Sequence, residues 1–139
     1  MKSFVVTVSI RADPGKIWGI LTDAARYPAW NPTVTKVEGR IALGERLVVH
    51  VATTTGRAFP VTVSQLDTAR RMTWKGGLPF GLFMGMRTFT LTPHPDGTVD
   101  FAMREEFSGL LAPLIGRTIP DLQPAFDEFA AALKREAER

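Results

Sequence analysis

The sequence contains no cysteine and only two histidines, His50 and His94. The lack of cysteine excludes disulfide bonds, thiolate nucleophiles, iron–sulfur clusters and zinc sites with cysteine ligands. Two histidines cannot form a three-histidine metal site. His50 is out of phase with the apolar residues of its segment and His94 falls in a turn, so neither is placed to activate a serine or threonine. We therefore expect no metal and no cofactor.

Long apolar runs are also missing. No segment approaches the roughly 18 consecutive apolar residues that a transmembrane helix needs. The first residues lead into an alternating segment rather than a continuous apolar stretch, which is not the pattern of a signal peptide. The sequence therefore predicts no transmembrane segment and a cytoplasmic protein.

A cationic stripe is absent as well. The chain has 17 basic and 14 acidic residues, a formal net charge of +3, and the basic residues are scattered, with Arg70-Arg71 and Lys134-Arg135 as the only basic doublets. Proteins that follow a phosphate backbone concentrate their Lys and Arg on one face. We therefore expect no nucleic-acid partner.

What is present is a composition suited to one globular domain. The 139 residues are 45% hydrophobic and 22% charged, and a chain of this length buries enough surface to fold without a metal or disulfide. No linker, repeat or low-complexity tract interrupts it. We therefore predict a single domain over residues 1–139.

The residue patterns predict mostly short strands between an early helical region and a late helix. Residues 3–10 alternate apolar and polar side chains, and Asp13-Pro14 then offers an N-cap and a first helical residue for a helix over about 14–22. A second short helix or turn carries residues 24–29. Strands are predicted at 34–40, 46–54, 58–66, 70–76, 84–93 and 98–108, at the regular spacing of an antiparallel meander.

The end of the chain changes to a helical period. Apolar residues recur at steps of three and four from Ile115 to Leu133. Pro120 and Pro124 would break a helix interior, so the helix either starts with Asp121 as N-cap and Pro124 in its first turn, or kinks near Gly116. We favour the first, with a helix over 121–138 after a separate helical turn at 110–117.

Several local motifs, together with this order, resemble the START-like helix-grip superfamily, also called SRPBCC, and within it the polyketide cyclase/dehydrase-like proteins. The motifs span the whole chain; they are Ile10-Arg11-Ala12-Asp13-Pro14 with Ile17-Trp18, Tyr27-Pro28-Ala29-Trp30-Asn31-Pro32, Gly39 and Gly44 before Leu47, Trp74-Lys75-Gly76-Gly77, and Glu105-Glu106-Phe107-Ser108-Gly109-Leu110-Leu111. The resemblance implies an α+β fold in which a curved antiparallel seven-stranded sheet wraps a long C-terminal helix, with two short helices after the first strand. It also implies a cavity for a hydrophobic ligand between sheet and helix, which a minority of members use for catalysis.

The turn between the last two predicted strands fixes their register independently of the resemblance. Pro95 and Gly97 suit a short hairpin loop that pairs His94 with Thr98. Continuing the pairs places Arg87 opposite Glu105 on the apolar face of the sheet. Two interpretations stay open: a structural ion pair whose charged ends reach water near the end of the sheet, or a polar anchor inside a cavity.

The aromatic residues allow two interpretations too. Each could pack in the core or line the cavity, and as a set they are more numerous than a thin core requires. Counting the neighbours on the same faces, the ligand-binding residues that we predict are Trp30, Trp74, Phe80, Phe83, Arg87, Phe89, Phe101, Met103, Glu105, Leu122 and Phe126.

Residues 76–86 combine four glycines with two phenylalanines and two methionines. The segment lacks the Lys and Ser/Thr of a phosphate loop, and no helix follows it. It suits a mobile apolar lip at a cavity mouth, and equally a hydrophobic bulge packed on the core.

These observations favour a binding or carrier protein for a small hydrophobic molecule. The alternative is a metal-independent cyclase, dehydratase or isomerase in the same cavity, with Glu105 as candidate general base and Arg87 as the group that stabilises an enolate or carboxylate. An adjacent arginine keeps a carboxylate ionised, which weakens it as a base. A third alternative is a module that binds a protein or a quinone-carrying membrane. These features are compatible with either a monomer or a homodimer.

Overall fold

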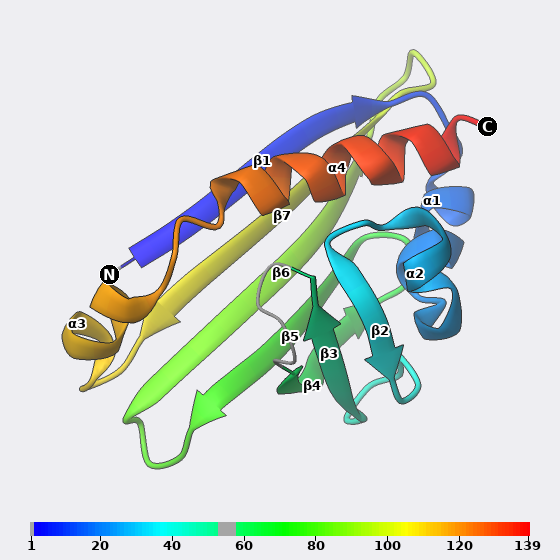
Figure 1. The fold of residues 1–139 in the computed structure, drawn as a ribbon. Coiled ribbons are helices and arrows are strands. Elements are labelled where there is room, and N and C mark those ends of the chain that lie inside the picture. The colour runs from blue at the N-terminus through cyan, green and yellow to red at the C-terminus, as the bar shows by residue number, and fades with distance from the viewer. Residues whose placement is uncertain (1, 53–57) are drawn as a thin grey trace.

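The computed structural model describes residues 2–52 and 58–139, and it forms seven strands and a small number of helices (Figure 1). The strands are β1 (Lys2–Ile10), β2 (Val34–Glu38), β3 (Arg46–Val51), β4 (Ala58–Asp67), β5 (Arg71–Leu78), β6 (Phe83–Pro93) and β7 (Val99–Ser108). The α-helices are α1 (Pro14–Leu21), α2 (Tyr27–Trp30), α3 (Ala112–Ile115) and α4 (Gln123–Ala137), with 3₁₀ turns at Ala24–Arg26 and Gly116–Thr118.

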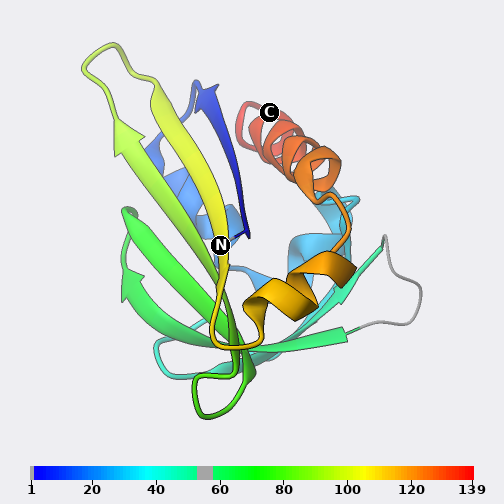
Figure 2. The same ribbon diagram turned by 90° about the vertical axis from the view of Figure 1, so that its left-hand side faces the viewer.

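The strands form one antiparallel sheet in the order β1-β7-β6-β5-β4-β3-β2. Figure 2 shows that the sheet curls and that α4 lies on its concave side, where it packs mainly against β1. The two strands that are adjacent to each other at one edge, β1 and β7, come from opposite ends of the sequence. This is the predicted helix-grip arrangement, and the fold prediction is confirmed.

Phe129 of α4 is the centre of the core. Its ring stacks on Phe101 at 6.1 Å between centroids and meets Trp30 at 5.5 Å, Tyr27 at 6.3 Å and Phe89 at 6.2 Å. The helix thereby fastens the sheet to the short helix α2. Burial of several aromatic side chains, each worth a few kcal/mol relative to exposure, is the main force that holds α4 in the concave face.

The predicted strands are present with ends that shift by a few residues, and the end of the predicted strand 46–54 runs into residues 53 and 54, outside the described residues. The start of the last helix also differs from the prediction. Helix α4 begins at Gln123 rather than Asp121, and its N-cap is Leu122. Asp121 instead accepts a hydrogen bond from the backbone N–H of Gln123 (3.0 Å) in the turn before the helix. Pro124 lies in the first turn of the helix, where a backbone N–H would have no partner within the helix, so its absence costs nothing.

The predicted hairpin register is confirmed. The His94 backbone N–H donates to the Thr98 carbonyl, and beyond this turn Leu91 faces Phe101, Phe89 faces Met103 and Arg87 faces Glu105. In the part of the chain that the structure describes, no helix is long and apolar enough to cross a membrane.

Candidate functional site

One row of side chains crosses the concave face and contains its only opposed charges among the described residues. The register pairs Phe4 of β1 with Glu105 of β7, Glu105 with Arg87 of β6, Arg87 with Trp74 of β5, and Trp74 with Val63 of β4. Directly opposed residues of antiparallel strands point to the same face. The sheet therefore places a carboxylate, a guanidinium and an indole side by side in an otherwise apolar row. We call this row, from Phe4 to Val63, the charged row.

Arg87 and Glu105 form an ion pair, with Nε of Arg87 donating to Oε1 of Glu105 at 2.8 Å. Their side chains are 22% and 15% exposed, so the pair is neither sealed nor freely solvated. Within residues 2–52 and 58–139, Nε is the only nitrogen of Arg87 with a hydrogen-bond partner. The two terminal nitrogens of the guanidinium therefore remain available as donors for a ligand oxygen.

Helix α4 covers the ion pair with an aromatic ring. Cζ of Arg87 lies 4.9 Å from the centroid of Phe126, whose ring also lies 6.0 Å from that of Phe4. A cation over an aromatic face is stabilised electrostatically, more so where water is partly excluded. Phe126 thus holds the guanidinium plane in place as well as packing against the sheet.

Three buried donors have no acceptor among the described residues, and one of them lies beside Arg87. The Nε1 atoms of Trp74 and Trp30 and the Nδ2 atom of Asn31 are buried and have no hydrogen-bond partner among the described residues. Buried polar groups are normally paired, and an unpaired one costs about 1 to 3 kcal/mol. Trp74 is the direct cross-strand neighbour of Arg87, so donors exceed acceptors on this part of the concave face.

Burial decreases along the strands from one side of the row to the other. On one side of Arg87 and Glu105, Phe89 and Met103 are fully buried. On the other side Gly85 has no side chain, and the ring of Phe107 lies against it, 3.2 Å from the position that a Cβ would take. Phe83 stacks on Phe107 at 5.8 Å and is partly exposed. The charged row therefore lies between a closed core and an open apolar end.

Tyr27 is a buried hydroxyl that could be considered as a general acid. It is fully buried, and its hydroxyl donates to the Leu21 carbonyl at 2.7 Å. Burial raises the pKa of Tyr27 well above its ordinary value, and the nearby charge of Arg87 lowers it by less. A hydroxyl that is tied to the backbone and hard to ionise fastens α2 to α1 and is poorly suited to proton transfer.

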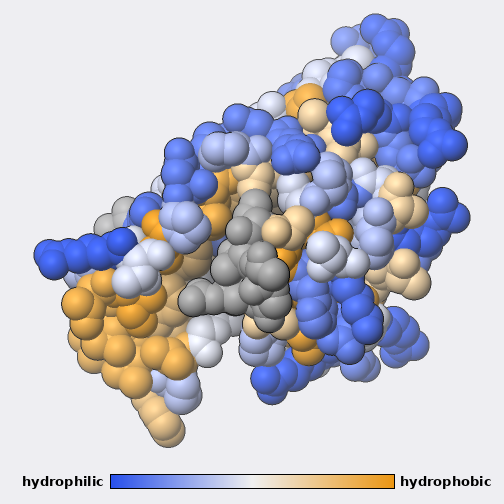
Figure 3. All heavy atoms as spheres, viewed as in Figure 1, coloured by the Kyte–Doolittle hydropathy of each residue, from blue (hydrophilic) through white to orange (hydrophobic). Residues whose placement is uncertain are grey.

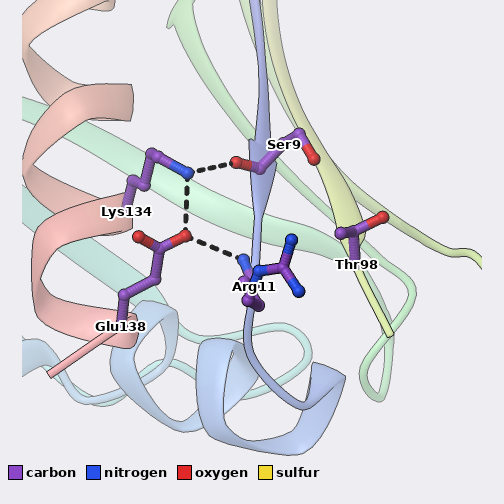
Figure 4. A pocket seen from close by; sticks show the side chains of 5 residues that line it. All are labelled: Ser9, Arg11, Thr98, Lys134 and Glu138. Atoms are coloured by element: carbon purple, nitrogen blue, oxygen red, sulfur yellow. Dashed lines mark hydrogen bonds and ion pairs between the residues drawn. The ribbon is translucent and has the colours of Figure 1, made fainter. Parts of the chain in front are cut away.

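Two surface hollows lie away from this row. One, of about 390 Å³, is bordered by Ser9, Arg11, Thr98, Lys134 and Glu138 (Figure 4). Lys134 and Glu138 are already engaged there, because Lys134 donates to the Ser9 carbonyl and to Glu138, which also accepts from the Arg11 backbone N–H. These bonds tie the end of α4 to β1. The other, of about 380 Å³, lies by the β5–β6 turn and is bordered by Thr62, Ser64, Lys75, Gly76, Gly77, Leu78, Pro79, Phe83 and Met84.

The structure brings most of the predicted ligand-binding residues to one side of the sheet, at different depths. Trp74, Phe89, Phe101, Met103 and Phe126 are buried, whereas Trp30, Phe83, Arg87, Glu105 and Leu122 are partly exposed. Phe80 is not among them, because it lies in the β5–β6 turn with 93% of its surface exposed. The prediction omitted Phe129 and Phe107, although the spacing of Phe126 and Phe129 along one helical face could have indicated the first.

Neither histidine belongs to the charged row. His50 pairs with Glu38 at 2.6 Å and His94 with Asp100 at 2.9 Å, both on or near the outer surface. In the described ranges 2–52 and 58–139, no three acidic or histidine side chains converge as metal ligands would. The chemistry of the concave face is thus that of one carboxylate, one guanidinium and unpaired N–H donors.

The sequence matches, over residues 1–138, the family described as polyketide cyclase / dehydrase and lipid transport. The chain belongs to this family. Comparison with curated proteins gives no match. Membership agrees with the predicted resemblance to START-like proteins and supports a helix-grip domain that binds a ligand.

Solved structures share the fold over nearly the whole chain. A Mesorhizobium loti protein is 24% identical, with a TM-score of 0.73, covering 96% of this chain and 95% of its own. A truncated norcoclaurine synthase from Thalictrum flavum is 15% identical, with a TM-score of 0.71 and coverages of 97% and 92%. A START superfamily protein from Mycobacterium smegmatis is 18% identical, with a TM-score of 0.70 and coverages of 98% and 97%.

Proposed function

We propose that this family member binds a small, mostly apolar molecule that carries one anionic or carbonyl oxygen, and that Arg87 binds this oxygen. The observation behind the proposal is the excess of donors on the concave face: Arg87 uses only Nε for Glu105, and Nε1 of the neighbouring Trp74 has no acceptor. A ligand oxygen would supply the missing acceptor. Binding sites for small molecules are mostly apolar with a few such polar groups.

The apolar part of the ligand would lie toward the open end. Phe83 and Phe107 stack on each other on that side of the row, and Phe83 and Leu122 are partly exposed. The fully buried Phe89, Phe101 and Met103 would form the floor rather than the walls. The proposed lining is therefore Trp30, Trp74, Phe83, Arg87, Glu105, Leu122 and Phe126.

A carrier role accounts for these residues better than catalysis does. Glu105 is the one carboxylate in the charged row, and one of its oxygens already accepts from Arg87. Proton abstraction by Glu105 would require its free oxygen to act while the guanidinium stabilises the negative form. The second candidate, a cyclase or dehydratase, rests on the same pair, with Glu105 as base and Arg87 next to a developing oxyanion.

Two fluorescent probes of similar size test the anchor. We would titrate the protein with the anionic 1-anilinonaphthalene-8-sulfonate and with the uncharged N-phenyl-1-naphthylamine. Arg87→Gln is expected to weaken the anionic probe about tenfold or more, the value of a charge-assisted hydrogen bond, and to change the uncharged probe little. Arg104→Gln is the matched control, because Arg104 of β7 forms a 2.7 Å ion pair with Glu106 on the opposite face of the sheet.

Two results would contradict the proposed site. If the wild type binds neither probe saturably, or if Arg87→Gln and Arg104→Gln weaken the anionic probe equally, the proposed site is wrong. Should Arg87→Gln prove poorly folded, the double variant Arg87→Gln, Glu105→Gln replaces the pair with two neutral amides and gives the same comparison. Mass spectrometry of molecules retained after native purification would then identify the ligand.

A further inference from the structure

The exposed apolar side chains are concentrated at one end of the molecule. Among the residues that the structure describes, eight large hydrophobic side chains are exposed, and five of them belong to the tip of the β5–β6 hairpin or to α3 and the residues before it. We call these five the apolar tip: Leu78, Phe80, Met84, Leu110 and Leu114. In Figure 3 hydrophobic residues gather over this end, below a strip of hydrophilic ones.

The apolar tip is a built surface rather than two loose loops. The backbone N–H groups of Leu110 and Leu111 donate to the carbonyls of Gly81 and Leu82, at 3.1 and 2.7 Å. Gly109 allows this approach, because a Cβ there would lie 2.7 Å from the Leu82 carbonyl oxygen. Phe80 has a φ of 60°, in the left-handed region, and stands 93% exposed at the end of the hairpin. The backbone thus holds a large aromatic ring in water at an energetic cost.

The two segments that carry the apolar tip contain basic residues and no acidic ones. Residues 72–87 and 107–120 contain Lys75, Arg87 and Arg117 but no Asp or Glu. Lys2 adds a second cation beside Arg117, since its Nζ donates to the carbonyl of Ile119 at 3.0 Å. In the described ranges, Lys2, Lys75 and Arg117 form no ion pair.

We propose that the apolar tip inserts into the surface of an anionic lipid bilayer, with Lys2, Lys75 and Arg117 facing the lipid phosphates. Membrane-surface binding combines buried apolar area with attraction between cations and anionic headgroups, and both are present here. A second copy of the chain fits less well, because a symmetric contact would bring the same unpaired cations together. The proposal goes beyond the ligand site and does not depend on it, although the open end of the concave face lies beside Phe83, next to the tip.

Co-sedimentation with vesicles tests the proposal. The wild type is expected to bind vesicles of phosphatidylglycerol and phosphatidylcholine at least tenfold more tightly than vesicles of phosphatidylcholine alone, and added salt should remove this difference. Phe80→Ser, Leu114→Ser and Arg117→Glu should each weaken binding about tenfold. Leu43→Ser is the matched control, because Leu43 is as exposed as Leu114, 64% in each case, but lies on the loop before β3. Its affinity should not change.

Three outcomes would overturn the proposal: no binding of the wild type to the mixed vesicles, equal losses in Leu43→Ser and Leu114→Ser, or a concentration-dependent dimer that Leu114→Ser dissociates. The last would identify the tip as an interface between two copies. Circular dichroism melts of every variant show that each is folded. Because the fluorescent probes report on Arg87 without vesicles, failure of membrane binding and failure of the ligand site are distinguished.

Discussion

The guanidinium of Arg87 lies against the ring of Phe126, 4.9 Å from Cζ to the ring centroid. One residue comes from the middle of the sheet and the other from the C-terminal helix, 39 residues later in the chain. The contact joins the charged row to the helix that covers it. Phe126 is therefore part of the core and also covers Arg87, the residue that we propose binds the ligand oxygen.

These contacts predict that removal of the Phe126 ring lowers the stability of the protein. Phe126 is 2% exposed and contacts Phe4 as well as Arg87, so Phe126→Ala should lower the free energy of unfolding by about 3 to 5 kcal/mol. Urea unfolding measures this. Leu43→Ala, at an exposed leucine, should cost no more than about 0.5 kcal/mol. A loss for Phe126→Ala below about 1 kcal/mol would mean that the ring borders open space rather than packed side chains.

Two ion pairs on opposite faces of β6 and β7 should differ in their contribution to stability. Arg87→Met leaves Glu105 partly buried without its partner and is expected to cost about 1 to 3 kcal/mol. Arg104→Met breaks the outer pair with Glu106, whose side chains are 58% and 40% exposed, and should cost less than about 1 kcal/mol. Thermal or urea unfolding of both variants decides the matter, and equal costs would contradict the difference in environment.

The charged row could be predicted from the sequence because its determinants are local. A short turn at Pro95 and Gly97 fixes the register of β6 against β7. Counting residue pairs back from this turn places Arg87 opposite Glu105, and no knowledge of the rest of the fold is needed. The roles of Phe129 and Tyr27 depend on packing between segments about 100 residues apart. Such contacts have no local pattern, so the sequence could suggest an aromatic core but not which rings meet.

Residues 76–86 show the same limit. Composition favoured a lip and a packed bulge equally, and the structure extends both strands into the segment, leaving only residues 79–82 as a turn. Phe83 stacks on Phe107 while Phe80, three residues away, is exposed. The side to which each ring points depends on the positive φ at Phe80 and Gly81. Such a backbone state is not readable from a run of glycines and apolar residues.

The two phenylalanines of this hairpin should therefore respond differently to the same change. Phe83→Ser removes a stacked, partly buried ring and is expected to lower the free energy of unfolding by about 1 to 3 kcal/mol. Phe80→Ser removes an exposed ring and should change it by no more than about 0.5 kcal/mol. Urea unfolding of the pair gives the comparison directly. Equal stability of the two variants would show that the Phe83–Phe107 stack contributes nothing.

The far end of α4 predicts a response to acid. Glu138 accepts from the Arg11 backbone N–H at 2.8 Å and from Lys134 at 2.7 Å, and these bonds, the first above all, hold the pKa of Glu138 below its ordinary value of 4.5. The folded state therefore binds this proton less readily than the unfolded chain. The stabilising effect is full above the ordinary pKa and is lost as the pH falls through the lowered one.

Replacement of Glu138 should remove this acid-sensitive contribution. Glu138→Gln is expected to be less stable than the wild type near neutral pH, and the difference should shrink as the pH is lowered from about 5 to about 3. Urea unfolding across this range measures it. Glu128→Gln is the control, because Glu128 is an exposed acid within α4, and its substitution should change the stability little. A Glu138→Gln curve that stays parallel to the wild type would show that the contact with Arg11 and Lys134 does not form in solution.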